Sequence, residues 1–196
     1  MSIEIGEGRS EQVAERFRPR ARAVDHRALV AAVGYVRVLL IALWLGAAVF
    51  FSAAVAPSVF AVLRSFHLSN ANEIAGSIVT RTLSIVNTGG FLIGLLLLLS
   101  AFLFRRAVSR RAFRAEVISL LIVAAATGVG QWIIAARMLG LRGAMGKPVD
   151  EVAQSDPLRV AFNNLHGYSV GALSIGILAG LVALLLIARR ARANSV

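Results

Sequence analysis

Residues 160–188 read VAFNNLHGYSVGALSIGILAGLVALLLIA, a stretch of 29 residues without Lys, Arg, Asp or Glu. A helix rises about 1.5 Å per residue and the hydrocarbon core of a bilayer is about 30 Å thick, so about 20 apolar residues span it. Residues 181–187 are apolar on every helical face, which leaves no polar stripe for water. The stretch therefore predicts a membrane-spanning helix rather than a helix of a soluble bundle.

Three more runs share this property: residues 38–63, 82–104 and 117–136, of 26, 23 and 20 residues. Together the four runs make up half of the 196-residue chain, and all 31 charged residues lie in the other half. A charged residue at the centre of a bilayer costs at least about 2.5–3.5 kcal/mol on insertion scales. The hydrophobic share of 58% also exceeds the 45–50% of soluble domains. We predict an all-α, integral membrane four-helix bundle.

The net charge of +11 has an explanation that does not involve nucleic acid. Residues 1–37, 105–116 and 189–196 hold 15 of the 21 basic residues, and residues 64–81 and 137–159 hold the other 6. Loops rich in Lys and Arg stay in the cytoplasm. The alternation predicts a multi-pass protein of the cell inner (plasma) membrane with both termini cytoplasmic, and no nucleic-acid partner.

Two units follow from this division. Residues 1–25 are polar and predict a mobile basic cytoplasmic arm, and residues 26–192 form the four-helix membrane domain. Within the domain, residues 105–116 and 139–157 are expected to be connections. Pro57 should bend the first long helix, Asp156-Pro157 should start the last one, and Arg37 should extend to the inner headgroups.

Small residues recur four apart in three of the predicted helices, at Gly90/Gly94, Ala124/Gly128, Gly167/Gly171 and Gly176/Gly180. Because lipid tails are as apolar as leucine, helices in a membrane associate by close backbone packing. The pairs favour a compact bundle. The competing interpretation is a homo-oligomer that uses a small-residue face of the last helix.

Polar residues inside or beside the spans are the candidates for function. With the predicted topology, helices three and four bring His166, Asn163, Gln131 and Arg137 to the outer leaflet. His67 lies near the same depth, just beyond the first helix. We predict that they form a polar pocket for a small ligand or a metal. The alternative is that they are hydrogen-bonded structural contacts between helices.

Motifs of common enzyme classes are absent from the sequence: there is no Walker loop, G-x-S-x-G, HExxH or dinucleotide fingerprint, and no acidic pair within the four runs. We predict no catalytic residue. The lack of cysteine excludes disulfides and thiolate metal sites. Copper remains an option through His67, His166 and Met138 or Met145, because imidazole and thioether groups suit it.

Two motifs resemble a known family. Leu43-Trp44-Leu45-Gly46, followed by Ala56-Pro57, resembles the first helix of the transmembrane-protein-205-like family, a domain of unknown function. Residues 162–169, FNNLHGYS, are similar to its last-helix signature F-x-x-L-H-x-x-S. The resemblance implies four membrane helices and a shared surface that includes Trp44, Gly46, Pro57 and Ser169.

More distantly, the architecture is similar to copper resistance protein D and to membrane protoporphyrinogen oxidases, which implies haem or copper as a cofactor. The sequence offers one histidine inside the spans, His166, where ligation of haem by two histidines needs a pair. Three functions therefore stay open: binding or transport of a small ligand or metal through the outer pocket, haem- or copper-linked redox chemistry, and structural assembly with another membrane protein.

Overall fold

The computed structural model describes residues 7–68, 70–103 and 109–193, and every regular element in these ranges is helical. The elements are α1 (Glu7–Phe50), the π-helical segment η1 (Phe51–Val55), α2 (Ala56–Ser65), α3 (Ala71–Leu103), α4 (Arg110–Gly128), the π-helical segment η3 (Val129–Ile134), α5 (Ala135–Met145), the 3₁₀ turn η4 (Val149–Glu151) and α6 (Pro157–Ala193).

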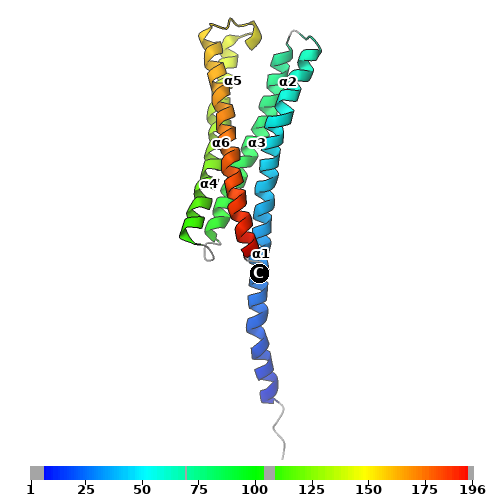
Figure 1. Cartoon of the computed structure of the whole chain (residues 1–196), viewed down its shortest axis with the longest axis vertical. Helices are drawn as coiled ribbons and strands as arrows, with labels where there is room; N and C mark the ends of the chain where they lie inside the picture. Colours follow the sequence, from blue (N-terminus) through cyan, green and yellow to red (C-terminus); the bar gives the residue numbers. More distant parts are fainter. Residues whose placement is uncertain (1–6, 69, 104–108, 194–196) are drawn as a thin grey trace, which may run out of the picture.

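Four continuous helical stretches are long and apolar enough to cross a membrane: Leu29–Ser65, Ala71–Leu103, Arg110–Met145 and Pro157–Arg192. Each of the four predicted runs lies within one of these stretches, apart from residue 104, which is outside the described residues. This confirms the all-α class and the number of candidate spans. The α2–α3 connection and the α5–α6 connection lie at the upper end of Figure 1, and the C-terminal part of α6 lies at the opposite, lower end.

The helices are longer than the charge-free runs, so two predicted connections were too long. Residues 110–116 form the first two turns of α4, which Ser109 caps by accepting a hydrogen bond from the N–H of Ala112 at 3.3 Å. Residues 139–145 belong to α5, which ends at Gly146 with φ of +61°. Hydropathy locates the membrane core, whereas Ala, Arg and Leu extend a helix beyond it because their helix propensity is high.

Residues 7–25, which fall in the predicted mobile arm, are the beginning of α1. The helix extends below the bundle (Figure 1). Residues 1–6 of that arm lie outside the described residues.

The predicted start of the last helix is confirmed. Pro157 is the first residue of α6, and the Asp156 carboxylate accepts a hydrogen bond from the N–H of Leu158 at 2.8 Å. Pro57 lies directly after a departure from α-helical hydrogen bonding. Because proline lacks an N–H, the α pattern of hydrogen bonds is interrupted there, and the preceding segment η1 is π-helical, with the N–H of Ala56 bonded to the carbonyl of Phe51.

Trp44 on α1 belongs to the buried core, 3% exposed, and packs against α3 and α6. Its indole N–H donates to the carbonyl of Val86 at 3.0 Å. A Cβ on Gly90 would lie 2.5 Å from the indole nitrogen, and one on Gly180 would lie 2.7 Å from the ring. Both glycines are therefore required for the indole to fit.

The other predicted small-residue pairs divide into two groups. Gly94 packs on Ala124, where an added Cβ would approach to 3.2 Å, and Gly128 lies against the ring of Phe91 at the same distance. Gly167 and Gly171 instead have nothing within 4 Å and face outward from α6. The compact bundle thus uses the pairs on α3 and α4 and the Gly176/Gly180 pair, and leaves one face of α6 uncovered.

Candidate functional site

Three charged side chains from three helices meet at the lower end of the bundle, and two of them are buried. Arg37 on α1 donates from Nη2 to the Glu116 carboxylate on α4 and to the carbonyl of Leu97 on α3 at 3.3 Å. Arg190 on α6 lies 3.5 Å from the second oxygen of Glu116. The side chains of Arg37, Glu116 and Arg190 are 5%, 2% and 11% exposed. We call these three residues the ionic cluster.

The ionic cluster corrects two sequence interpretations. Arg37 turns into the bundle instead of extending to the headgroups, and Glu116 lies inside the helix contact region instead of in a connection. A signal was present in the helical period. Glu116 shares a spacing of three, four and seven with Ser119, Leu120 and Val123, all of which are buried on α4.

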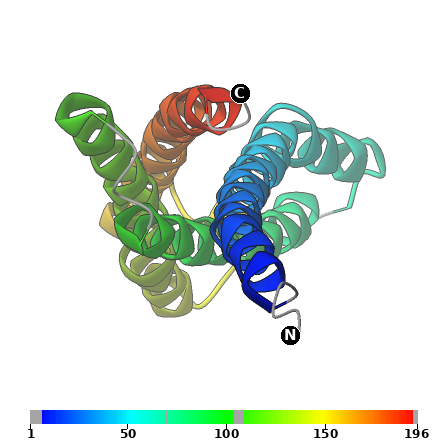
Figure 2. The same cartoon turned by 90° about the horizontal axis from the view of Figure 1, so that it is seen from below.

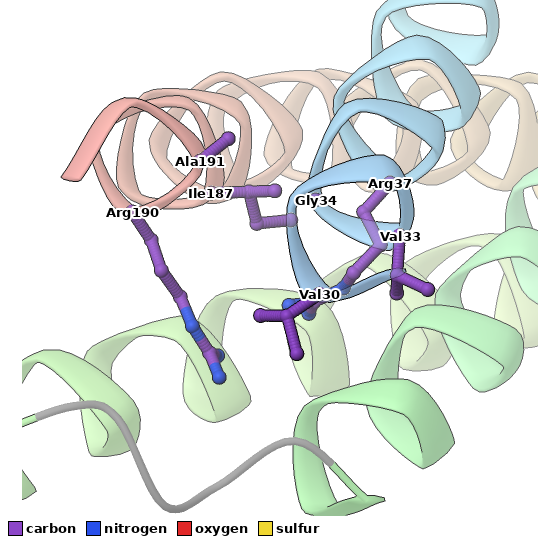
Figure 3. A pocket seen from close by; sticks show the side chains of 7 residues that line it. All are labelled: Val30, Val33, Gly34, Arg37, Ile187, Arg190 and Ala191. Atoms are coloured by element: carbon purple, nitrogen blue, oxygen red, sulfur yellow. The ribbon is translucent and has the colours of Figure 1, made fainter. Parts of the chain in front are cut away.

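Figure 2 shows α1 and α6 from below. Gly34 allows the lower parts of these two helices to pack closely, because its Cβ position is 3.2 Å from Ala191. A small recess lies between them, beside the ionic cluster. Arg37 and Arg190 line the recess together with the apolar side chains of Val30, Val33 and Ile187 (Figure 3). It therefore combines two cations with an apolar rim.

Further up the bundle, the contact between α3 and η3 is polar. Gln131 donates from Nε2 to the Ser84 hydroxyl at 2.9 Å, while its Oε1 is buried without a hydrogen-bond partner. Asn87 is 3% exposed, and its amide lies 3.1 Å from the Cβ position of Gly130. Gln131 is thus directed at α3 and serves a contact between helices.

At the upper end, Arg142 on α5 is a residue that sequence reasoning missed. Its guanidinium lies 3.4 Å from the Glu73 carboxylate on α3 and 5.6 Å from the centre of the Phe162 ring on α6. These two contacts join three helices, α3, α5 and α6. The sequence alone does not distinguish Arg142 from Arg137, because both are arginines near the end of the third predicted helix. Only the three-dimensional contacts with Glu73 and Phe162 distinguish Arg142.

The predicted outer residues lie on η3, α5, α6 and the turn after α2. Arg137 lines an open groove between α5 and α6 together with Asn164, Tyr168 and apolar neighbours. His166 and Asn163 are exposed on α6 but are not part of that lining. His67 is exposed in the turn after α2, with φ of +53°.

The residues expected to mark the family's shared surface also separate. Trp44 and Ser169 are buried, whereas Gly46 and Pro57 are exposed. Among the side chains that the structure describes, no group of three or more His, Asp or Glu residues is arranged to hold a metal ion.

A comparison with family models places the chain. The model of a domain of unknown function, DUF4149, matches residues 39–147, which is more than half of the chain. The chain belongs to the DUF4149 family. The DUF4149 match covers the segments that hold Trp44, Glu116 and Gln131, while α6 with His166 and Arg190 lies beyond it. No curated protein and no solved structure matches the chain.

The DUF4149 assignment agrees with the expected domain of unknown function in an all-helical protein with four candidate spans. The family description assigns no activity. Function is therefore argued from the arrangement of the side chains.

Proposed function

We propose that the protein is a multi-pass protein of the inner (plasma) membrane, with both termini cytoplasmic, that binds a small amphiphilic anion in its outer half. The observation that carries the proposal is the groove between α5 and α6. Arg137, Asn164 and Tyr168 supply its polar groups, and Leu141, Ala161 and Leu165 supply an apolar floor. The proposed groove keeps Arg137 from the predicted outer-leaflet pocket. Asn164 and Tyr168 take the place of the other predicted residues.

The chemistry of the groove favours a ligand with an acidic head and a short apolar tail. A guanidinium pairs with carboxylate or phosphate through two parallel hydrogen bonds. The Asn164 amide and the Tyr168 hydroxyl are additional hydrogen-bonding groups, and the apolar floor accepts an alkyl chain.

The test measures binding of decyl phosphate and decanoate to the purified full-length protein in neutral detergent, with decanol as the uncharged control. We expect Arg137→Gln to weaken binding of both anions about tenfold or more, since hydrogen bonds to charged groups contribute about 1.5–3 kcal/mol. Lys147→Gln, which removes an exposed cation at the same end, should leave affinity unchanged. Equal losses in the two variants, or tight binding of decanol, would refute the groove.

The same purified sample separates this proposal from the haem- or copper-linked alternative. Binding of the anion by a protein without a Soret band and without copper supports the groove. Stoichiometric haem or copper that is lost in His166→Ala supports the redox alternative instead.

Assembly with a second copy is the other function that a specific observation favours. Gly167 and Gly171 leave an open, smooth face on α6, and such faces allow membrane helices to pack closely. We expect Gly171→Leu to lower the oligomeric mass measured by light scattering in detergent. Gly46→Leu, a change at another open glycine, should have no effect. A monomeric mass for the unchanged protein would contradict the proposal.

A further inference from the structure

The ionic cluster at the lower end carries a charge that its own residues do not balance. Arg37 and Arg190 contribute two positive charges and Glu116 one negative charge, so the three groups, of which Arg37 and Glu116 are buried, sum to one positive charge. Removing charges from water is costly unless they are paired and fully hydrogen-bonded. The cluster therefore favours an additional anion.

A second observation points to the place of that anion. Nε of Arg37 is buried and has no hydrogen-bond partner, although Arg37 is only 4% exposed. Arg37 also lines the recess between α1 and α6 (Figure 3). An oxygen acceptor in the recess would give the guanidinium the partner that it lacks.

The size and the rim of the recess define the chemistry of the anion. Its volume is about 10 Å³, roughly the space of one water molecule, which accepts a single oxygen atom rather than a whole ion. Val30, Val33 and Ile187 form an apolar rim. A group that inserts one charged oxygen and keeps an apolar remainder outside fits this shape.

The surroundings of the recess also attract negative charge. Exposed arginines lie at the same end of the bundle, at Arg110, Arg111, Arg114, Arg189 and Arg192. Among the described side chains of residues 29–40, 95–120 and 183–192, Glu116 is the only carboxylate. Basic residues near a membrane surface attract anionic lipids by about 1 kcal/mol each.

We propose that the recess between Arg37 and Arg190 binds the phosphate of an anionic phospholipid headgroup, with one phosphate oxygen inserted and the glycerol and acyl portion against the apolar rim. The site lies at the opposite end of the bundle from the groove at Arg137 and is independent of it. In this arrangement the lipid completes the contact between α1, α4 and α6.

The experiment measures the melting temperature of the full-length protein in neutral detergent during titration with dihexanoyl phosphatidylglycerol, dihexanoyl phosphatidylcholine or inorganic phosphate. A ligand that binds only the folded protein raises the melting temperature with its concentration. We expect phosphatidylglycerol to raise it and the other two to leave it unchanged at equal concentration. Equal stabilisation by inorganic phosphate would overturn the lipid assignment, and equal stabilisation by phosphatidylcholine would overturn the anion site.

Three variants test the residues. Arg190→Gln makes the cluster neutral and should weaken the phosphatidylglycerol effect at least tenfold, whereas Arg189→Gln removes an exposed arginine next to it and should retain the effect. Glu116→Gln raises the buried charge to two and should strengthen binding, a change that loss of folding cannot imitate. Equal weakening in Arg190→Gln and Arg189→Gln, or weaker binding in Glu116→Gln, would refute the site.

Discussion

The Trp44 indole fits into the core only because Gly90 and Gly180, which lie against it, have no Cβ. A Cβ at position 90 would lie 2.5 Å from the indole nitrogen and 2.7 Å from the Thr127 methyl group, distances that real Cβ atoms do not show. Overpacking of a core typically costs 1–3 kcal/mol. We expect Gly90→Ala to lower the free energy of unfolding in detergent by about 2 kcal/mol, measured by thermal or denaturant unfolding.

The neighbouring glycine supplies the control for this prediction. Gly89 has nothing within 4 Å of its Cβ position. Gly89→Ala adds the same methyl group to the same helix, and we expect it to raise the unfolding free energy by up to about 1 kcal/mol because alanine has the higher helix propensity. Equal effects in the two variants would show that the indole does not occupy the space next to Gly90.

At the scale of the helix, the contact between α1 and α6 determines whether the ionic cluster forms. The Cβ position of Gly34 lies 3.2 Å from Cβ of Ala191, and disulfides join Cβ atoms about 3.5–4.5 Å apart. Because the chain has no cysteine, the pair Gly34→Cys with Ala191→Cys can be read without interference. We expect oxidation to join the two cysteines in a disulfide. The cross-linked chain should migrate faster in denaturing gel electrophoresis, and reductant should reverse the change.

The matched control moves one cysteine to the outer side of α6. Leu185 is 52% exposed and lies away from the core, so Gly34→Cys with Leu185→Cys should stay reduced. Cross-linking of the control at the same rate would mean that α6 rotates freely against α1, and the ionic cluster would then have no fixed geometry.

The helices were predictable from the sequence and their partners were not, for a physical reason. The composition of a charge-free run shows that the run itself lies in lipid, so the four candidate spans could be predicted from the sequence. The cap at Asp156 is equally local and was also predicted. A buried charge instead depends on distant partners. Glu116 pairs with Arg37 across 79 positions and Gln131 with Ser84 across 47. Read alone, Glu116 resembles a loop residue, and Gln131 resembles a ligand-binding residue.

At the scale of the whole molecule, the two ends differ in how many basic residues they carry. In the upper half, Arg142 is paired with Glu73 and Arg159 donates to the carbonyl of Val152, while Arg64, Arg81, Arg137 and Lys147 are exposed. At the lower end, Arg110, Arg111 and Arg114 are exposed. Residues 1–37, 105–116 and 189–196 hold 15 basic residues, against 6 in residues 64–81 and 137–159. The end that carries more basic residues stays on the cytoplasmic side.

This asymmetry predicts the orientation of the protein. A fluorescent protein fused after residue 196 should be bright, and alkaline phosphatase fused at the same position should be inactive, because that end stays in the cytoplasm. Phosphatase inserted after Gly146, between α5 and η4 at the upper end, should be active. Reversal of both phosphatase results would invert the orientation and would place the Arg137 groove in the cytoplasmic leaflet. Phosphatase that is active at both positions would instead contradict a single membrane crossing, by α6, between residue 146 and the C-terminus.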